Sequence, residues 1–353
     1  MGKAKYVDDI ALQGMVEVAF VRSTHGHALI KKINVEKAKA HSSCIDVITH
    51  EDFDGRTTTL PPSTNKDADV KAVSTPFLAK DKVRHVGEII AAVVAPTRYI
   101  AEDLIELVEV EYESLPAYND VEDALSNDAS LLHEEVGSNV YYRDTYRNGN
   151  VEAAFKDADV IVEEKIRTGR TSASPMETRG VIAEWGWDEK LTVWSSTQMP
   201  FPLRTYIATH LKLPEQMIRV VAPTVGGGFG QKAHFFPEEF ILPWIAKRIR
   251  KPVKWIEDRR EHLLTAAHAK QNTIFMKIGL KKDGTISGMK IKNIGDSGAY
   301  SQYPWSGLIE SMVANKGCTG PFTIENVEYE TLVVLTNKMA TGAYRGVGWS
   351  AGC

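Results

Sequence analysis

Hydrophobic positions change their period twice in a short stretch of the N-terminal region. Residues 86–95 (VGEIIAAVVA) form a continuous apolar run, which is typical of a β-strand buried on both faces. Residues 98–108 (RYIAEDLIELV) carry apolar side chains at helical spacing, and residues 108–113 (VEVEYE) alternate again. Together with a strand predicted at 15–23 (MVEVAFVRS), this order predicts an α/β unit near the N-terminus.

Between residues 180 and 258 the pattern predicts alternating strands and helices. The expected elements are a hairpin at 180–198 turning at 188–190, a helix at 203–211, a strand at 218–223, a loop at 225–232, a helix at 237–250 and a strand at 253–258. The helix at 237–250 begins with proline and carries acidic residues early and basic residues late, as a helix dipole favours. Pro243 predicts a kink within it.

The strongest local prediction is a hairpin over residues 274–295, because Asp283-Gly284 stands between two alternating runs. Residues 114–144 are polar and acidic without sustained periodicity, which indicates a linker. We therefore predict an α+β fold with a first domain at 1–120, a linker at 121–150 and a second domain at 151–353.

Composition narrows the class of protein. The 353 residues are 43% hydrophobic and 25% charged, near globular averages, which argues against collagen, coiled coils and wholly disordered chains. With 42 Lys+Arg against 46 Asp+Glu, the formal net charge of -4 provides no cationic field, so we expect no nucleic-acid partner. No run reaches ~18 consecutive apolar residues, and we expect no membrane partner.

Three cysteines, Cys44, Cys318 and Cys353, are too few and too scattered for a disulfide scaffold or a Cys-x-x-Cys metal site. This usage indicates a reducing compartment, and we expect a cytoplasmic location.

The segment Val225-Gly226-Gly227-Gly228-Phe229-Gly230-Gln231-Lys232 carries the clearest functional signal. Glycine lacks Cβ, so a ligand can lie against the backbone and successive N–H groups can converge on anionic or oxo groups. The glycine spacing matches neither G-x-G-x-x-G nor the phosphate loop that ends in Gly-Lys-Ser/Thr. The alternative interpretation is a tight structural turn.

Other candidate sites are weaker. His268 and Ser297 imitate serine-protease fragments, but both flank one predicted hairpin, so we do not expect a catalytic triad. His25 and His27 lack a nearby third metal ligand. The segment with His234 lacks the H-E-x-x-H order. We therefore assign no side chain as a metal ligand.

Three further segments are ambiguous when each is taken alone. They are PMETRG at 175–180, STQMP at 196–200 and GAYRG at 342–346. Arg179 and Arg345 could be ordinary ion-paired arginines, and Gln198 could be a strand-end amide.

Taken together, the motifs carry a resemblance. PMETRG, STQ, VGGGFGQK, EDRREHL, DSGAY, GPFTIENV and TNKMATGAYRG occur in an order and spacing similar to the molybdenum-binding large subunit of the xanthine dehydrogenase and aldehyde oxidase family. GKAKYVDDI, FVRSTHGHALI and the segment at 83–117 resemble that family's α/β hammerhead domain. The resemblance implies a hammerhead domain at 1–120 and the first part of a molybdopterin-binding domain at 151–353.

The resemblance also implies a site. Gln198 would donate an amide hydrogen bond to a metal oxo ligand, and the backbone of Gly227, Gly228, Phe229 and Gly230 would lie beside the same centre. Arg345 and Gly346 match the loop on the other side, where the arginine can meet pterin or substrate oxygens. Gln231 is a candidate to face substrate. The implied catalytic residues are Gln198, Phe229 and Arg345.

The family's chemistry supplies the cofactor and partner predictions. A molybdenum ion on molybdopterin, or on its cytosine dinucleotide form, hydroxylates an aldehyde or N-heterocyclic carbon with water. Electrons then leave through an iron–sulfur subunit to a FAD subunit, in a complex expected to be a dimer of heteromers acting on a small-molecule substrate. Carbon monoxide dehydrogenases place a copper-binding cysteine where Gly346 stands, so carbon monoxide is disfavoured as a substrate.

The family's large subunits continue beyond the position that matches Cys353, and the glutamate used as general base lies in that continuation. We therefore expect either one part of a split subunit, inactive until a polypeptide carrying the other half binds, or a truncated product. The alternative function is a non-catalytic remnant acting as an assembly or binding module.

Overall fold

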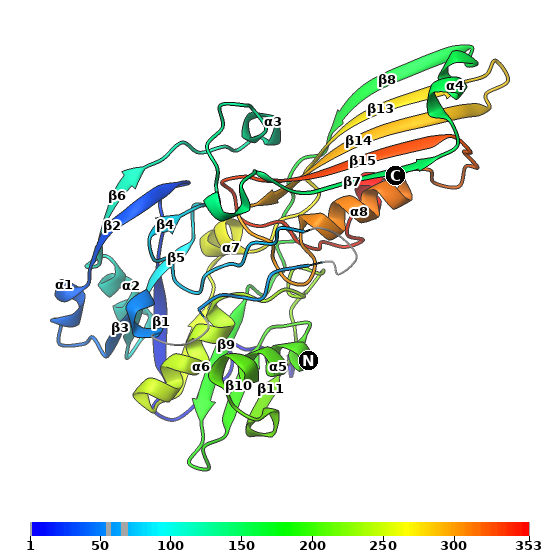
Figure 1. Cartoon of the computed structure of the whole chain (residues 1–353). Coiled ribbons are helices and arrows are strands. Elements are labelled where there is room, and N and C mark those ends of the chain that lie inside the picture. Colours follow the sequence, from blue (N-terminus) through cyan, green and yellow to red (C-terminus); the bar gives the residue numbers. More distant parts are fainter. Residues whose placement is uncertain (1, 54–57, 65–69, 353) are drawn as a thin grey trace. The chain divides into compact units, whose positions relative to one another are not determined.

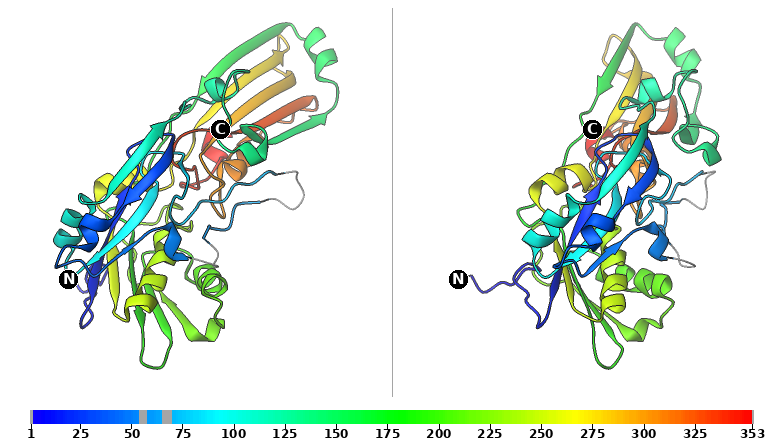
Figure 2. Two further views of the ribbon diagram at one scale, coloured as in Figure 1. Left: turned by 60° about the vertical axis from the view of Figure 1, so that its left-hand side comes forward. Right: turned by 90° about the vertical axis from the view of Figure 1, so that its left-hand side faces the viewer.

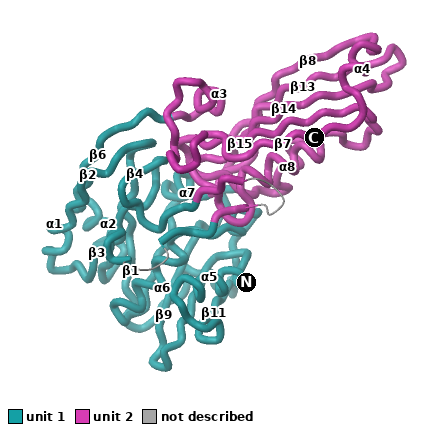
Figure 3. Tube along the Cα trace, in the orientation of Figure 1, with its two compact units in different colours: residues 1–61, 74–117, 173–266 teal, residues 62–73, 118–172, 267–353 magenta. Residues whose placement is uncertain are grey.

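The structure, a computed structural model, describes residues 2–53, 58–64 and 70–352. The chain folds into two compact units, which Figure 3 shows in different colours. Unit 1 consists of Met1–Pro61, Ser74–Ala117 and Ala173–Ala266, and unit 2 consists of Pro62–Val73, Tyr118–Ser172 and Ala267–Cys353. Each unit is therefore assembled from segments that are far apart in the sequence.

Unit 1 is built on a seven-stranded sheet with the order β11-β10-β9-β12-β1-β5-β3. β5 (Ile89–Ala95) lies between β1 (Val16–Arg22) and β3 (Asp46–Ile48), α2 (Arg98–Ile105) packs on it, and it is buried along its whole length. This position explains its continuous apolar run. The remaining strands are β9 (Gly180–Trp185), β10 (Leu191–Ser195), β11 (Ile218–Val221) and β12 (Val253–Ile256).

A second, three-stranded sheet in unit 1 has the order β4-β2-β6 (Figure 1). The predicted strand, helix and strand between residues 86 and 113 are confirmed as β5, α2 and β6. The strands of this second sheet and the helices of unit 1 are β2 (Ala28–Asn34), β4 (Lys82–Val83), β6 (Glu109–Ser114), α1 (Glu36–Lys39), α2 (Arg98–Ile105), α5 (Pro200–Leu211), α6 (Glu238–Ile249), α7 (Arg259–Thr265), and the 3-10 helices η1 (His50–Phe53) and η3 (Glu215–Met217).

Helix α6 covers β9 and β12, and its first nine residues are buried. Pro237 is its N-cap residue, one position before the helix begins. Pro243 lies inside the helix, and its carbonyl accepts a 3.0 Å hydrogen bond from Trp185 Nε1. The glycine-rich segment connects β11 to α6, so both a strand end and a buried helix fix its position.

Unit 2 is built on a five-stranded sheet with the order β7-β15-β14-β13-β8. Its strands are β7 (Val140–Asn148), β8 (Val160–Arg167), β13 (Asn272–Leu280), β14 (Ile286–Gly298) and β15 (Val327–Leu335). α8 (Gly307–Gly317) packs on β14 and β15, as Figures 1 and 2 show. The short helices of the unit are α3 (Val121–Ala124), η2 (Glu134–Val136), α4 (Val151–Lys156) and α9 (Trp349–Gly352).

The hairpin predicted over residues 274–295 is confirmed by the antiparallel pair β13 and β14. At its turn Gly284 has φ +88°, a left-handed conformation that favours glycine. The Asp283 carboxylate accepts a 3.0 Å hydrogen bond from the Thr285 N–H. The turn residues therefore act as the sequence predicts.

The segment 121–150, predicted as a linker, contains α3, η2 and the edge strand β7. Periodicity missed β7 because only Tyr141 and Tyr142 are buried in it, and its last six residues are exposed. β8, at the opposite edge of the sheet, is exposed along its whole length and gives no burial pattern either. The division of the chain into domains at residues 120 and 150 stays a prediction.

Candidate active site

The glycine-rich segment lies in unit 1 and adopts a conformation that few other residues allow. Gly227, Phe229 and Gly230 have φ values of +101°, +53° and +91°. A Cβ on Gly228 would lie 2.5 Å from the Gln198 Cδ atom, closer than real Cβ contacts. Glycine at this position therefore lets the Gln198 side chain lie against the loop backbone.

Gln198 follows the end of β10 and is joined to the loop by two hydrogen bonds. Its Oε1 accepts from the Gly230 N–H at 2.9 Å, and its backbone N–H donates to the Lys232 carbonyl at 2.9 Å. Because the amide oxygen is engaged, the orientation of the amide is fixed and its NH2 group remains as the donor toward a ligand. The structure thus brings together Gln198 and the predicted loop residues Gly227 to Gly230.

The loop also presents backbone donors. Within the described residues, the N–H groups of Gly227, Gly228 and Phe229 have no hydrogen-bond acceptor. The Gly230 N–H is used to hold Gln198, so it is not a donor to a ligand. Three successive N–H groups and one amide NH2 fit a ligand rich in oxo or other acceptor atoms.

The Glu177 carboxylate contacts both ends of the glycine-rich loop. One carboxylate oxygen, Oε2, accepts from the Gly226 N–H at 2.7 Å and from the Lys232 ammonium at 2.8 Å. The other oxygen, Oε1, is enclosed and accepts no hydrogen bond from any residue that the structure describes. Neither Glu177 nor Lys232 was assigned a role from the sequence, although both stand inside motifs that carry the family resemblance.

Arg179 is an ion-paired arginine buried next to this site. Its guanidinium contacts Glu257 at 2.5 Å and Glu238 at 3.2 Å. Burial by itself would lower the pKa of Arg179, because it disfavours the charged guanidinium. The ion pairs with Glu238 and Glu257 have the larger effect and raise this pKa. Burial likewise raises the pKa of Glu257, but the Arg179 charge and the hydrogen bonds from His262 and Arg179 lower it to about 2.

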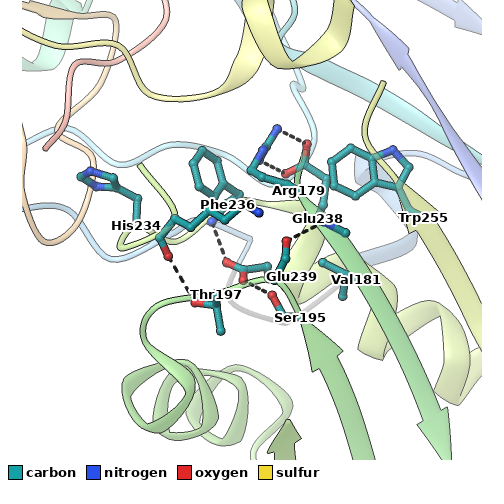
Figure 4. A pocket seen from close by; sticks show the side chains of 12 residues that line it. Arg179, Val181, Ser195, Thr197, His234, Phe236, Glu238, Glu239 and Trp255 are labelled. Atoms are coloured by element: carbon teal, nitrogen blue, oxygen red, sulfur yellow. Dashed lines mark hydrogen bonds and ion pairs between the residues drawn. The ribbon is translucent and has the colours of Figure 1, made fainter. Parts of the chain in front are cut away.

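Glu239 has the opposite protonation behaviour. Its carboxylate accepts from Ser195 Oγ at 2.7 Å and from the Phe236 N–H at 3.1 Å. Burial dominates here and raises the pKa of Glu239 to about 7. Figure 4 shows these side chains around a small cavity of ≈ 10 Å³, lined also by Thr197 and Trp255.

Arg345 and Gly346 belong to unit 2. Arg345 has φ +25° and Gly346 has φ +94°, so the backbone turns sharply here. The Arg345 side chain is exposed and has no ion pair or hydrogen bond within the part of the chain described. The preceding segment is held by hydrogen bonds from the Thr341 N–H to the Ser297 carbonyl and from the Gly342 N–H to the His268 carbonyl.

Two other features bear on the predictions. Gln231 is fully buried within unit 1, so the hypothesis that it faces substrate is not supported. Among the described residues, no three His, Cys, Asp or Glu side chains lie close enough to hold a metal ion, and no helix is long and apolar enough to cross a membrane.

The fold and this loop define a class of protein, a hammerhead domain joined to a molybdopterin-binding domain. Residues 1–116 match the family described as "Aldehyde oxidase and xanthine dehydrogenase, a/b hammerhead domain". Residues 132–353 match the "Molybdopterin cofactor-binding domain". The chain therefore belongs to the molybdopterin-binding oxidoreductases of the xanthine dehydrogenase and aldehyde oxidase type, as the motifs predicted, and the predicted fold class is confirmed.

Individual relatives agree with this assignment. The nicotine 6-hydroxylase large subunit of Paenarthrobacter nicotinovorans is 36% identical over 353 residues, covering 99% of this chain and 43% of its own length. The solved quinoline 2-oxidoreductase from Pseudomonas putida 86 superposes with a TM-score of 0.94 at 39% identity, covering 99% of this chain and 44% of that one. The chain thus spans less than half the length of these relatives.

A third relative has a different length. The nicotinate dehydrogenase large molybdopterin subunit of Eubacterium barkeri is 30% identical over 348 residues, covering 99% of this chain and 78% of its own length.

The prediction that disfavours carbon monoxide as a substrate is not supported. The carbon monoxide dehydrogenase large chain of Afipia carboxidovorans is 34% identical over 365 residues, covering 98% of this chain and 44% of its own length. Similarity to this enzyme is nearly as high as similarity to the nicotine 6-hydroxylase subunit, so overall resemblance does not exclude carbon monoxide.

Proposed function

We propose that this chain forms the oxo-ligand side of the active site in a molybdenum hydroxylase that adds water-derived oxygen to an aldehyde or N-heterocyclic carbon. The observation that carries the proposal is the Gln198 amide, whose oxygen is held by the Gly230 N–H so that its NH2 group is the donor. Nicotine and quinoline, named in two relatives, are N-heterocycles, which supports that substrate class.

The residues present fit a molybdopterin cofactor. The N–H groups of Gly227, Gly228 and Phe229 offer donors without protein acceptors, and the enclosed Glu177 Oε1 offers an acceptor. When bound, the cofactor would supply the redox chemistry. Gln198 would stabilise negative charge at the ligand by its NH2 donor, the loop N–H groups would orient the cofactor, and Arg345 would bind pterin or substrate oxygens.

The same proposal includes partner subunits. The cofactor would be molybdopterin or its cytosine dinucleotide form, and iron–sulfur clusters and FAD would reside on two further subunits in a dimer of heteromers. The part of the large subunit beyond the length matched here would supply the remaining surface and the general base. Cys44 and Cys318 are free thiols, which supports a cytoplasmic location.

Metal analysis of the complex purified from its source tests the proposal. Stoichiometric molybdenum that stays with this chain supports the hydroxylase. Persistent absence of molybdenum from an intact complex supports the second candidate, a non-catalytic assembly or binding module.

Replacing Gln198 tests its role in that complex. Because one hydrogen-bond donor to developing charge is removed, Gln198→Ala should lower kcat by roughly 10–1000-fold at unchanged molybdenum content. Gln216→Ala, at an exposed glutamine of η3 in the same unit, is the matched control and should leave kcat unchanged. An unchanged rate for Gln198→Ala would contradict the assignment.

A further inference from the structure

The glycine-rich loop is closed by one buried ion pair. Lys232, the last residue of the loop, is 2% exposed, and its ammonium lies 2.8 Å from Glu177 Oε2. The same oxygen accepts from the N–H of Gly226, the first glycine of the loop, at 2.7 Å. A single carboxylate oxygen therefore joins both ends of the loop.

The loop has few other ways to hold its shape. Four of its residues are glycines, which contribute no side-chain packing and lose much backbone entropy on ordering. The close approach itself requires glycine, since a Cβ on Gly226 would lie 2.5 Å from the Glu177 Cβ. Among the contacts of the described residues, the Glu177 carboxylate joins the two ends of the loop by binding both the Gly226 N–H and the Lys232 ammonium.

The main chain of Lys232 is hydrogen-bonded directly to that of Gln198. The Lys232 carbonyl accepts from the Gln198 N–H at 2.9 Å and from Thr197 Oγ1 at 3.4 Å. The Gln198 side chain is in turn held by Gly230, within the same loop. A shift of Lys232 therefore moves both the main chain and the amide of Gln198.

The energetics favour a positioning role over a stabilising one. Burial lowers the pKa of Lys232, and the hydrogen bond and charge of Glu177 oppose that effect. A buried ion pair contributes little net stability compared with a well-packed apolar pair, whereas its directional contacts fix geometry.

We propose that Glu177 and Lys232 are positioning residues that fix the Gly226–Lys232 loop and, through it, the Gln198 amide relative to the bound cofactor. The identity of that cofactor rests on the proposed function, whereas closure of the loop by the pair does not.

Hydrogen exchange tests the closure of the loop, in the chain as purified with the subunits that accompany it. Lys232→Met removes the ammonium at similar side-chain length and should speed exchange of the Gly226, Gly230 and Ala233 amides by about 10-fold or more. Amides of α6 should keep wild-type rates. Glu215→Gln, which removes the exposed ion pair with Arg204 in the same unit, is the matched control and should leave the loop unchanged.

Two exchange results would overturn the proposal. One is an unchanged rate in the loop, and the other is equal acceleration in the loop and in α6, which would mean general loosening of the unit. Should Lys232→Met fail to fold because it leaves the Glu177 charge unpaired, the neutral pair Glu177→Gln with Lys232→Met replaces it, with the same expected result.

A double-mutant cycle tests the link to Gln198. In the molybdenum-containing complex, Lys232→Met should lower kcat by about 10-fold or more with little change in KM, because it weakens a contact that acts in the transition state. Added to Gln198→Ala, it should lower kcat by less than about twofold. Full multiplication of the two effects would overturn the link. If the complex contains no molybdenum, the proposed function fails, and the exchange experiment still decides the closure of the loop.

Discussion

Two glutamates in one buried region of unit 1 differ in protonation because their neighbours differ. Glu257 faces Arg179 and His262, and its pKa falls to about 2. Glu239 has only Ser195 Oγ and one backbone N–H as hydrogen-bond donors among the described residues, and burial raises its pKa to about 7. At Glu257 the neighbouring charges have the larger effect on the pKa, and at Glu239 desolvation has the larger effect.

Glu239 should therefore make stability depend on pH. Its pKa is higher in the folded chain than the value of 4.5 for an exposed glutamate, so the folded state binds the extra proton. This contribution is complete below about pH 4.5 and is lost as the pH rises through 7. Between pH 5 and pH 8, wild type should lose roughly 2–3 kcal/mol of unfolding free energy relative to Glu239→Gln.

Urea denaturation at the two pH values measures that difference. Glu189→Gln, at an exposed residue of unit 1, should keep the wild-type pH dependence. A difference between wild type and Glu239→Gln that is the same at both pH values would contradict the raised pKa.

Gly228 provides a second test at the scale of one residue. Because its Cβ would lie 2.5 Å from the Gln198 Cδ, Gly228→Ala should displace the amide and lower kcat of the molybdenum-containing complex by roughly 10–1000-fold, as Gln198→Ala does. Gly169→Ala, where the added Cβ meets no atom within 4 Å, is the control. Wild-type turnover by Gly228→Ala would show that Gln198 can shift without loss of function.

At the scale of elements, the β13–β14 hairpin depends on its turn. Gly284 has φ +88° and open space around it, so the cost of a side chain there is conformational and not steric. Gly284→Ala should lower the unfolding free energy by about 1–2 kcal/mol, because alanine is strained in the left-handed region. Gly284→Asn should lower it less, since asparagine tolerates that region. Equal urea midpoints for all three chains would contradict this account.

At the scale of the whole molecule, the chain should not turn over substrate by itself. The donors Gln198 and the loop N–H groups cannot accept a proton, and a general base is commonly worth ~10²–10⁴ in rate. Co-expression with a polypeptide that matches the remaining length of the relatives should restore molybdenum content and turnover. Gln198→Ala in the same co-expression should restore the metal without the full rate. Turnover by the isolated chain would contradict the prediction.

The sequence by itself determined the elements whose burial is regular and the family to which the chain belongs. β5 and the hairpin β13–β14 were predictable because a strand buried on both faces and a left-handed turn each leave a local signature. The family was predictable because seven short motifs occur in one order. The strand and the turn are local signals and the motif order is read along the chain, so none of them requires knowledge of tertiary contacts.

Only the tertiary structure decided the rest. The edge strands β7 and β8 owe their conformation to pairing with β15 and β13, and their exposed side chains carry no period. The glutamates at 177, 239 and 257 are chemically identical in the sequence. Glu177 contacts both ends of a loop, the pKa of Glu239 is raised to about 7, and the pKa of Glu257 is lowered to about 2. These differences arise because hydrogen bonds, burial and neighbouring charge come from residues distant in the chain.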